Sequence, residues 1–204
     1  MRDTQAIVFD LYGTLLHLAH ETKPYKRLFQ DLGLQTPDEF TQARRIALTE
    51  DFDNLASLTR RLKPDTQVNL AFYEQELREE LASATLYPET LSVLERLREQ
   101  RLKLGLISNL ASPYKNPFFD LGLNKYFDEV LFSYDIGLRK PQPEIYQEMI
   151  NQLRIRPTQA LMTGDKVEAD VNGPRTVGIN AVYLDRTRNS TNSIHTLEGI
   201  FEHL

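Results

Sequence analysis

Asp10, Ser108, Lys140 and Asp165 are polar residues that lie at or just after the ends of separate apolar runs of the sequence. A carboxylate becomes a useful nucleophile when it is desolvated and directed at an electrophile. A serine hydroxyl can donate to a substrate oxygen, and a lysine ammonium can neutralise charge that builds in a transition state. We therefore expect Asp10 to be a catalytic nucleophile, with Ser108 and Lys140 as the other catalytic residues.

A second acid, Asp170, follows Asp165 near the start of a predicted helix. The two carboxylates could thereby face the same end of the sheet, and hard oxygen ligands of this kind suit Mg²⁺. The alternative is that Asp170 only stabilises the helix N-terminus, a contribution of about 0.3 to 1 kcal/mol. The sequence thus predicts Mg²⁺ as a cofactor, with Asp165 and Asp170 among its ligands.

Four short apolar runs that end in polar residues predict buried parallel strands, because such strands are apolar on both faces. These runs are 6–10, 102–109, 130–133 and 160–165. Helical patterns at 143–153 and 168–176 are short enough to be crossovers of βαβ units. The predicted fold class is α/β, a doubly wound, Rossmann-like parallel sheet, and polar residues at the carboxyl ends of its strands can meet in one crevice.

The stretch from about residue 16 to about residue 86 is much longer than an ordinary crossover and predicts an inserted unit. Its patterns are helical, and Thr36-Pro37-Asp38-Glu39 places a capping hydroxyl, a proline and first-turn acids at a helix start. The predicted helices lie at 25–32, 37–48 and 68–81. We expect a helical cap domain over residues 16–86 and an α/β core domain formed by residues 1–15 and 87–204.

Two further segments follow the predicted cap. An apolar face at helical spacing predicts a helix at 90–100 that packs against the sheet. The polar stretch 186–193 predicts a loop before a final helical segment, and we expect this tail to have a structural role.

The composition argues against several classes of function. The chain has 204 residues and a formal net charge of -5, so it offers no basic surface of the kind that binds nucleic acid. It has no cysteine, which excludes disulfides, thiolate nucleophiles and thiolate metal sites. The apolar run near the N-terminus is too short for a signal peptide or a membrane span. We expect a cytoplasmic enzyme that acts on a small molecule, without nucleic-acid or membrane partners, and the oligomeric state stays open.

Four short motifs occur in an order that resembles the haloacid dehalogenase-like (HAD) hydrolase superfamily. The motifs extend over nearly the whole chain and are Phe9-Asp10-Leu11-Tyr12-Gly13-Thr14-Leu15, Leu106-Ile107-Ser108-Asn109, Lys140-Pro141, and Thr163-Gly164-Asp165 followed by Asp170. The position of the helical insert, between the first two motifs, is also similar to the helical-cap type of this superfamily. The resemblance supports the α/β core with an inserted helical cap.

The resemblance also implies a hydrolase that forms a covalent intermediate on Asp10. It implies a Mg²⁺ site made by Asp10, Asp165, Asp170 and the backbone carbonyl of Tyr12, and a tyrosine can supply that carbonyl as well as any other residue.

Three residues near the expected nucleophile are candidates for substrate binding. Gly13 permits a sharp exit from the strand, and Thr14 can cap the backbone or contact a bound anion. The Tyr12 phenol can donate a hydrogen bond or line the pocket. We expect Tyr12, Thr14 and Asn109 to contact the substrate.

Tyr12 stands where phosphatases that this chain resembles usually carry a second aspartate, which protonates the leaving group and then activates water. General acid and base catalysis of that kind lowers a barrier by about 3 to 5 kcal/mol. A phenol with a pKa of about 10 is a poor base at neutral pH. We therefore predict a preference for substrates with good leaving groups, such as acyl phosphates or anhydrides.

A tyrosine at this position is also similar to the 2-haloacid dehalogenases of the superfamily, in which the aspartate attacks carbon and no metal is needed. That alternative predicts a cap arginine and aromatic residues around the substrate, for which Arg44 or Arg45 with Phe40 are the candidates. Against it, two carboxylates close to Asp10 leave excess negative charge beside a single lysine. Each repulsive pair costs about 3 kcal/mol at about 5 Å and an effective dielectric of about 20, unless a cation is present.

The sequence therefore predicts a Mg²⁺-dependent phosphatase that acts on a small phosphorylated metabolite through a phospho-aspartyl intermediate. A metal-independent 2-haloacid dehalogenase is the first alternative. A catalytically weak protein of the same fold, kept for binding or regulation, is the second.

Overall fold

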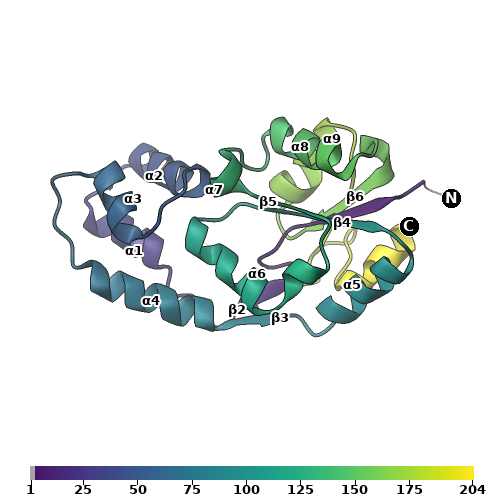
Figure 1. Cartoon of the computed structure of the whole chain (residues 1–204), viewed down its shortest axis with the longest axis horizontal. Helices are drawn as coiled ribbons and strands as arrows, with labels where there is room; N and C mark the ends of the chain where they lie inside the picture. Colours follow the sequence, from purple (N-terminus) through teal and green to yellow (C-terminus); the bar gives the residue numbers. More distant parts are fainter. Residues whose placement is uncertain (1–2) are drawn as a thin grey trace.

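Five parallel strands form the central sheet of the protein (Figure 1). The computed structural model describes residues 3–204, and the strands are β1 (Ala6–Phe9), β4 (Lys103–Ser108), β5 (Glu129–Phe132), β6 (Ala160–Gly164) and β7 (Asn180–Tyr183). Their order is β5-β4-β1-β6-β7, and every neighbouring pair is parallel. Because β1 is central and the chain winds outward on both sides of it, the predicted doubly wound sheet is confirmed.

Alternate residues of β1 point into two different hydrophobic cores, as the two-residue period of a strand requires. Ile7 and Phe9 join the core that α5, α6 and η5 cover, whereas Ala6 and Val8 join the core that α8 covers. These helices are α5 (Thr90–Glu99), α6 (Asn116–Asp120), the 3₁₀ helix η5 (Leu197–His203) and α8 (Pro143–Leu153). Burial on both faces explains why the strand reads as a continuous apolar run.

Shorter helical segments complete the connections around the sheet. They are the 3₁₀ turns η1 (Ser112–Lys115), η2 (Leu123–Lys125) and η3 (Pro157–Gln159), the helices α7 (Ser133–Ile136) and α9 (Gly173–Thr176), and the π-helical turn η4 (Val167–Asn172). The predicted helix at 143–153 is observed with those bounds as α8.

The predicted helix at 168–176 is instead a π-helical turn followed by the short helix α9. The backbone N–H of Gly173 donates to the carbonyl of Glu168, five residues earlier, so the carbonyl of Ala169 is free to accept another bond. That bond comes from the buried Tyr146 of α8, whose hydroxyl donates to it at 2.5 Å. A side chain that takes a carbonyl from the helix ladder is a known cause of such a bulge.

The long connection between β1 and β4 holds four helices that share a hydrophobic core of their own (Figure 1). They are α1 (Pro24–Asp31), α2 (Pro37–Thr49), α3 (Leu55–Leu62) and α4 (Leu70–Ala82). Two short antiparallel strands, β2 (Leu16–Leu18) and β3 (Ala84–Leu86), lead into and out of this helical unit. The helical insert predicted for this stretch is therefore present.

The start of α2 follows the predicted capping signal. The hydroxyl of Thr36 accepts from the backbone N–H of Glu39 at 3.2 Å, and the Glu39 carboxylate accepts from the backbone N–H of Thr36 at 3.1 Å. This reciprocal pair is a capping box, with Pro37 in the first turn. By contrast, α3 was not predicted, although the Asn54 side chain caps its start by accepting from the backbone N–H of Ser57.

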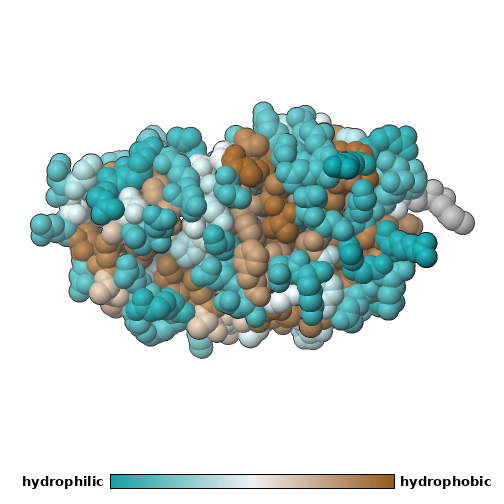
Figure 2. Space-filling model, viewed as in Figure 1, coloured by the Kyte–Doolittle hydropathy of each residue, from teal (hydrophilic) through white to brown (hydrophobic). Residues whose placement is uncertain are grey.

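Figure 2 shows hydrophilic residues over most of one face, with hydrophobic residues gathered near the middle, where the helical unit meets the sheet. Within residues 3–204, none of the helices is both long and apolar enough to span a membrane.

Leu58 of α3 is fully buried in the core of the helical unit, so Leu58→Ala should lower the free energy of unfolding by about 2 to 5 kcal/mol. Leu91→Ala is the matched control, because Leu91 is 38% exposed, and its loss should stay below about 1 kcal/mol. Urea unfolding followed by circular dichroism measures both. Equal losses for the two variants would contradict this description of the core.

Candidate active site

Lys140 joins two of the predicted acids in the interior of the protein. Its ammonium donates to Oδ1 of Asp10 at 2.7 Å and to Oδ1 of Asp170 at 2.6 Å. The Lys140 side chain is 2% exposed, and those of Asp10 and Asp170 are 11% and 1% exposed. The structure thus brings together residues that lie after β1, after β5 and in η4, at the carboxyl edge of the sheet.

The carboxyl group of Asp10 is held in an unusual electrostatic environment. Burial raises its pKa from the ordinary 3.8 to about 7, and the charges of Asp170 and Asp165 act in the same direction, while Lys140 opposes them. Burial by itself would lower the pKa of Lys140, but the two carboxylates that it contacts outweigh this and raise it. Lys140 is therefore a fixed positive charge in the site.

The carboxylates of Asp10, Asp165 and Asp170 form a cluster in which one ligand atom from each lies within 4.8 Å of the others. Oδ1 of Asp165 is buried and has no hydrogen-bond partner among residues 3–204. A buried carboxylate oxygen without a partner is costly, and a divalent cation is the partner that hard oxygen ligands prefer. This cluster therefore fits the Mg²⁺ that the sequence predicts.

Two glycines make room for the cluster. Gly13 has a φ of +82°, and a Cβ at this position would lie 2.6 Å from Oδ2 of Asp165. A Cβ on Gly164 would lie 2.4 Å from Oδ2 of Asp170. Both distances are far below van der Waals contact, so a side chain at either position would displace a carboxylate.

The other predicted site residues lie around Asp10. The hydroxyl of Thr14 is directed at Oδ2 of Asp10 at 3.4 Å, and Ser108 is a buried residue at the carboxyl end of β4. Asn109 makes a bond in each direction with the backbone of Lys140: its amide donates to the carbonyl at 2.7 Å and accepts from the N–H at 2.8 Å. Asn109 thus fixes the Lys140 segment, and its contact with a substrate stays a prediction.

The Tyr12 hydroxyl is engaged in a chain of hydrogen bonds that leads to the helical unit. It donates to the backbone carbonyl of Tyr114 at 2.8 Å, and the Tyr114 hydroxyl donates to Glu80 of α4 at 2.6 Å. The buried Glu80 carboxylate also accepts from the backbone N–H groups of Thr22 and Lys23 at the start of α1. Burial and the charge of Glu80 raise the pKa of Tyr12, so this phenol stays protonated.

Sequence reasoning missed a second lysine at the site. Lys166 donates to Oδ2 of Asp165 at 2.6 Å, and its side chain is 72% exposed. Because Asp165 contacts it, the pKa of Lys166 is raised. The only signal in the sequence was its position directly after Asp165, which by itself predicts no direction for the side chain.

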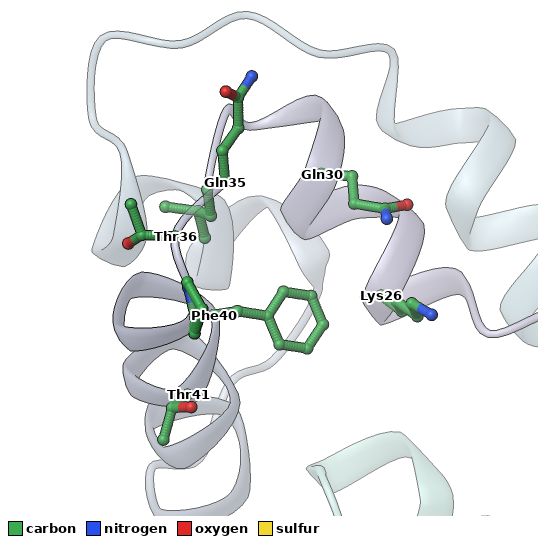
Figure 3. Close-up of a pocket in the computed structure, with 8 residues that line it drawn as sticks. Lys26, Gln30, Gln35, Thr36, Phe40 and Thr41 are labelled. Carbon is green, nitrogen blue, oxygen red and sulfur yellow. The ribbon is translucent and has the colours of Figure 1, made fainter.

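The candidate residues for a dehalogenase, Phe40, Arg44 and Arg45, all lie on α2 of the helical unit. Arg44 and Arg45 are exposed on α2. Phe40 packs edge-on against Phe29 and lines an open hollow of about 610 Å³ between α1 and α2, with Lys26 and Gln30 on the facing helix (Figure 3). This hollow is lined by residues of the helical unit and by none of the predicted catalytic residues.

A model of the haloacid dehalogenase-like hydrolases matches residues 4–178. The glyceraldehyde 3-phosphate phosphatase of Methanopyrus kandleri is 35% identical over 101 residues, which cover 49% of this chain and 43% of that protein. The pyrophosphatase PpaX of Oceanobacillus iheyensis is 26% identical over 174 residues, which cover 84% of this chain and 79% of that protein. For several of the curated relatives, the matched part of this chain spans less than half of the relative's length.

Solved structures of two differently named enzymes resemble the whole fold. One is a HAD phosphatase from Thermococcus onnurineus, with a TM-score of 0.68, 26% identity and coverage of 98% of this chain and 97% of that one. The other is a 2-haloacid dehalogenase from Pseudomonas syringae, with a TM-score of 0.68, 21% identity and the same coverage. The fold itself therefore does not distinguish between the two activities.

The raised pKa of Asp10 predicts a pH-dependent stability in the metal-free protein. A folded-state pKa above the unfolded value of 3.8 means that this residue's contribution is fully present below about pH 4 and is lost as the pH rises through about 7. Asp10→Asn removes this titration. As the pH rises from 4 to 8, the free energy of unfolding of the variant should therefore increase relative to that of the parent protein by up to about 4 kcal/mol.

Urea unfolding in the presence of a chelator, at several pH values between 4 and 8, measures this difference. Asp120→Asn is the control, since Asp120 is exposed on α6. A constant difference between Asp10→Asn and the parent protein over this range would show that Asp10 ionises at its ordinary pKa.

Proposed function

The chain belongs to the haloacid dehalogenase-like hydrolases, and we propose that it is a Mg²⁺-dependent phosphatase that acts through a phospho-aspartyl intermediate on Asp10. The observation that carries the proposal is the cluster of Asp10, Asp165 and Asp170, in which Oδ1 of Asp165 is buried without a partner among the described residues. Bound Mg²⁺ would supply positive charge to these carboxylates and to the phosphoryl oxygens of a substrate.

The residues around the cluster have separate roles in this proposal. An oxygen of Asp10 forms a bond to phosphorus while the bond from phosphorus to the leaving oxygen breaks, and water later hydrolyses the acyl phosphate on Asp10. Lys140 lowers the pKa of Asp10, against the effect of burial, and neutralises charge on the phosphoryl group. Ser108 and Thr14 donate hydroxyl hydrogen bonds to phosphoryl oxygens, and Asn109 contacts the substrate or holds Lys140 in place.

The balance of charge supports the metal. Three carboxylates with Lys140 and Lys166 leave an excess of one negative charge when all five groups are ionised. Lys166 is largely exposed, so solvent screens its attraction to Asp165, and an exposed ion pair of this kind contributes only about 0 to 1 kcal/mol. The second lysine reduces the repulsion that the sequence predicted without removing the need for a cation.

The position of Tyr12 supports a preference for good leaving groups. Its hydroxyl proton is used in the bond to the Tyr114 carbonyl, so Tyr12 is not placed to protonate a leaving alkoxide. Acyl phosphates and phosphoanhydrides release weakly basic groups that do not require such a proton. One relative, the pyrophosphatase, is named for a phosphoanhydride and fits this class, whereas the glyceraldehyde 3-phosphate phosphatase is named for a phosphomonoester.

The helical unit is the proposed cap domain, over residues 16–86, and residues 1–15 and 87–204 are the proposed core domain. Glu80 and Tyr114 join them through the hydrogen bond between α4 and η1. A substrate that enters between the two domains would meet cap side chains on one side and Asp10 on the other, so the cap would determine which metabolite is accepted.

The dehalogenase alternative has less support. Tyr12 favours it, and the fold is compatible with it. However, Arg44 and Arg45 are exposed on α2, and the carboxylate pair of Asp165 and Asp170 adds negative charge where a metal-free nucleophile would have to approach a 2-haloacid anion.

Purified protein should release phosphate from an acyl phosphate, and more slowly from nitrophenyl phosphate, with Mg²⁺ and not with chelator. Asp10→Asn should abolish this release, while Asp120→Asn, which changes an exposed acid on α6, should leave it unchanged. Halide release from a 2-haloacid that is insensitive to chelator would overturn the proposal in favour of the dehalogenase. Inactivity on all three substrates would favour a binding or regulatory protein.

Tyr12→Asp should restore an acid at the position where Tyr12 supplies none. We expect turnover of a simple phosphomonoester to rise at least about tenfold, since general acid catalysis is worth about a hundredfold or more when it is well placed. Tyr12→Phe removes the hydroxyl without adding an acid and should give no gain. Steady-state kinetics with both variants measures the effect, and equal rates for the two would contradict the proposed role of this position.

A further inference from the structure

Arg186 reaches from the loop after β7 to the backbone that follows the nucleophile. Its Nη2 donates to the carbonyl of Thr14 at 2.6 Å, and its Nε donates to the carbonyl of Gly13 at 3.3 Å. Its Nη1 donates to Oε1 of Glu89 at 2.8 Å. The side chain is only 18% exposed, although it lies in a segment that the sequence predicts to be a polar structural loop.

Two residues just before α5, Tyr87 and Glu89, hold this guanidinium in place. The ring of Tyr87 lies against it, with the Arg186 Cζ 3.4 Å from the ring centroid. Tyr87 also donates its backbone N–H to the carbonyl of Leu15, so the ring is tied to the same loop. Burial would raise the pKa of Glu89, but its hydrogen bond from Arg186 and further backbone donors lower it, which keeps the pair ionised.

The two carbonyls belong to residues that touch the carboxylate cluster. The Thr14 hydroxyl is directed at Oδ2 of Asp10 at 3.4 Å, and Gly13 lies so close to Asp165 that it has no space for a Cβ. A movement of this backbone would therefore change the distances between Asp10 and Asp165. Because Glu89 neutralises Arg186, the guanidinium acts on the cluster through geometry more than through its charge.

We infer that Arg186 is a positioning residue, which with Tyr87 and Glu89 forms a clamp on the Gly13–Thr14 backbone and so sets the aim of Asp10. The role rests on the proposed function, because it assumes that Asp10 is the nucleophile. A lysine could not replace it, since only the planar guanidinium can donate to three acceptors in fixed directions while it stacks on a ring.

Arg186→Lys keeps the charge and removes the fork, so it tests this inference. Hydrogen exchange of the amides of residues 13–16 should become at least about tenfold faster, whereas that of α8 should not change. With acetyl phosphate and Mg²⁺, kcat should fall at least about tenfold with KM altered less than about threefold, because misplaced groups slow the chemical step.

Arg96→Lys is a matched control. Arg96 also pairs with a carboxylate, that of Glu198, and also lies over an aromatic ring, with its Cζ 3.9 Å from the Phe201 centroid, but it donates to neither Gly13 nor Thr14. Its replacement should leave both exchange at residues 13–16 and kcat unchanged. Glu89→Gln weakens the clamp without removing the guanidinium, and it should accelerate exchange at the same amides by a smaller factor.

Exchange and kinetics in Arg186→Lys that match those in Arg96→Lys would overturn the inference. A fall in kcat accompanied by an equal loss in Arg96→Lys would do so as well, because it would indicate a general structural effect. If the parent protein releases no phosphate, the proposed function fails, and exchange at residues 13–16 still decides whether Arg186 holds this backbone.

Discussion

The buried ammonium of Lys140, between the carboxylates of Asp10 and Asp170, is the interaction on which the rest of the site depends. Three ionised groups in the interior are tolerated only when each has partners, and loss of one partner of a buried pair costs about 3 to 5 kcal/mol. The partners come from three different parts of the chain. The sheet order, with β1 between β4 and β6, is what brings these parts to one edge.

The backbone around this charge network is shaped to fit it. Gly13 and Gly164 leave space for carboxylates, and Asn109 fixes the backbone of Lys140. Arg186 donates to the backbone carbonyls of Gly13 and Thr14, in the loop that follows Asp10. The Tyr12 hydroxyl, in turn, connects this loop through Tyr114 to the helical unit. Substrate selection by the cap and the aim of the nucleophile are therefore physically linked in the proposed mechanism.

Local sequence patterns predicted the regular elements well, because periodicity and capping act over a few residues. The parallel strands and α8 follow from such patterns, as does the start of α2 at its capping box. The patterns failed where tertiary contacts override them. Tyr146 takes the carbonyl of Ala169 and turns an expected helix into a π-helical turn, and α3 depends on burial of Leu55 and Leu58 in the core of the helical unit.

The sequence by itself determined which residue types are available at the ends of the strands, and their order supported both the fold and an aspartate nucleophile. Only the tertiary structure decided that Asp170 contacts Lys140, that the Tyr12 hydroxyl turns toward Tyr114, and that Arg186 reaches the loop after Asp10. The physical reason is that these contacts join residues far apart along the chain. Their geometry is set by how the sheet, the helical unit and the C-terminal loop pack together, which no local pattern encodes.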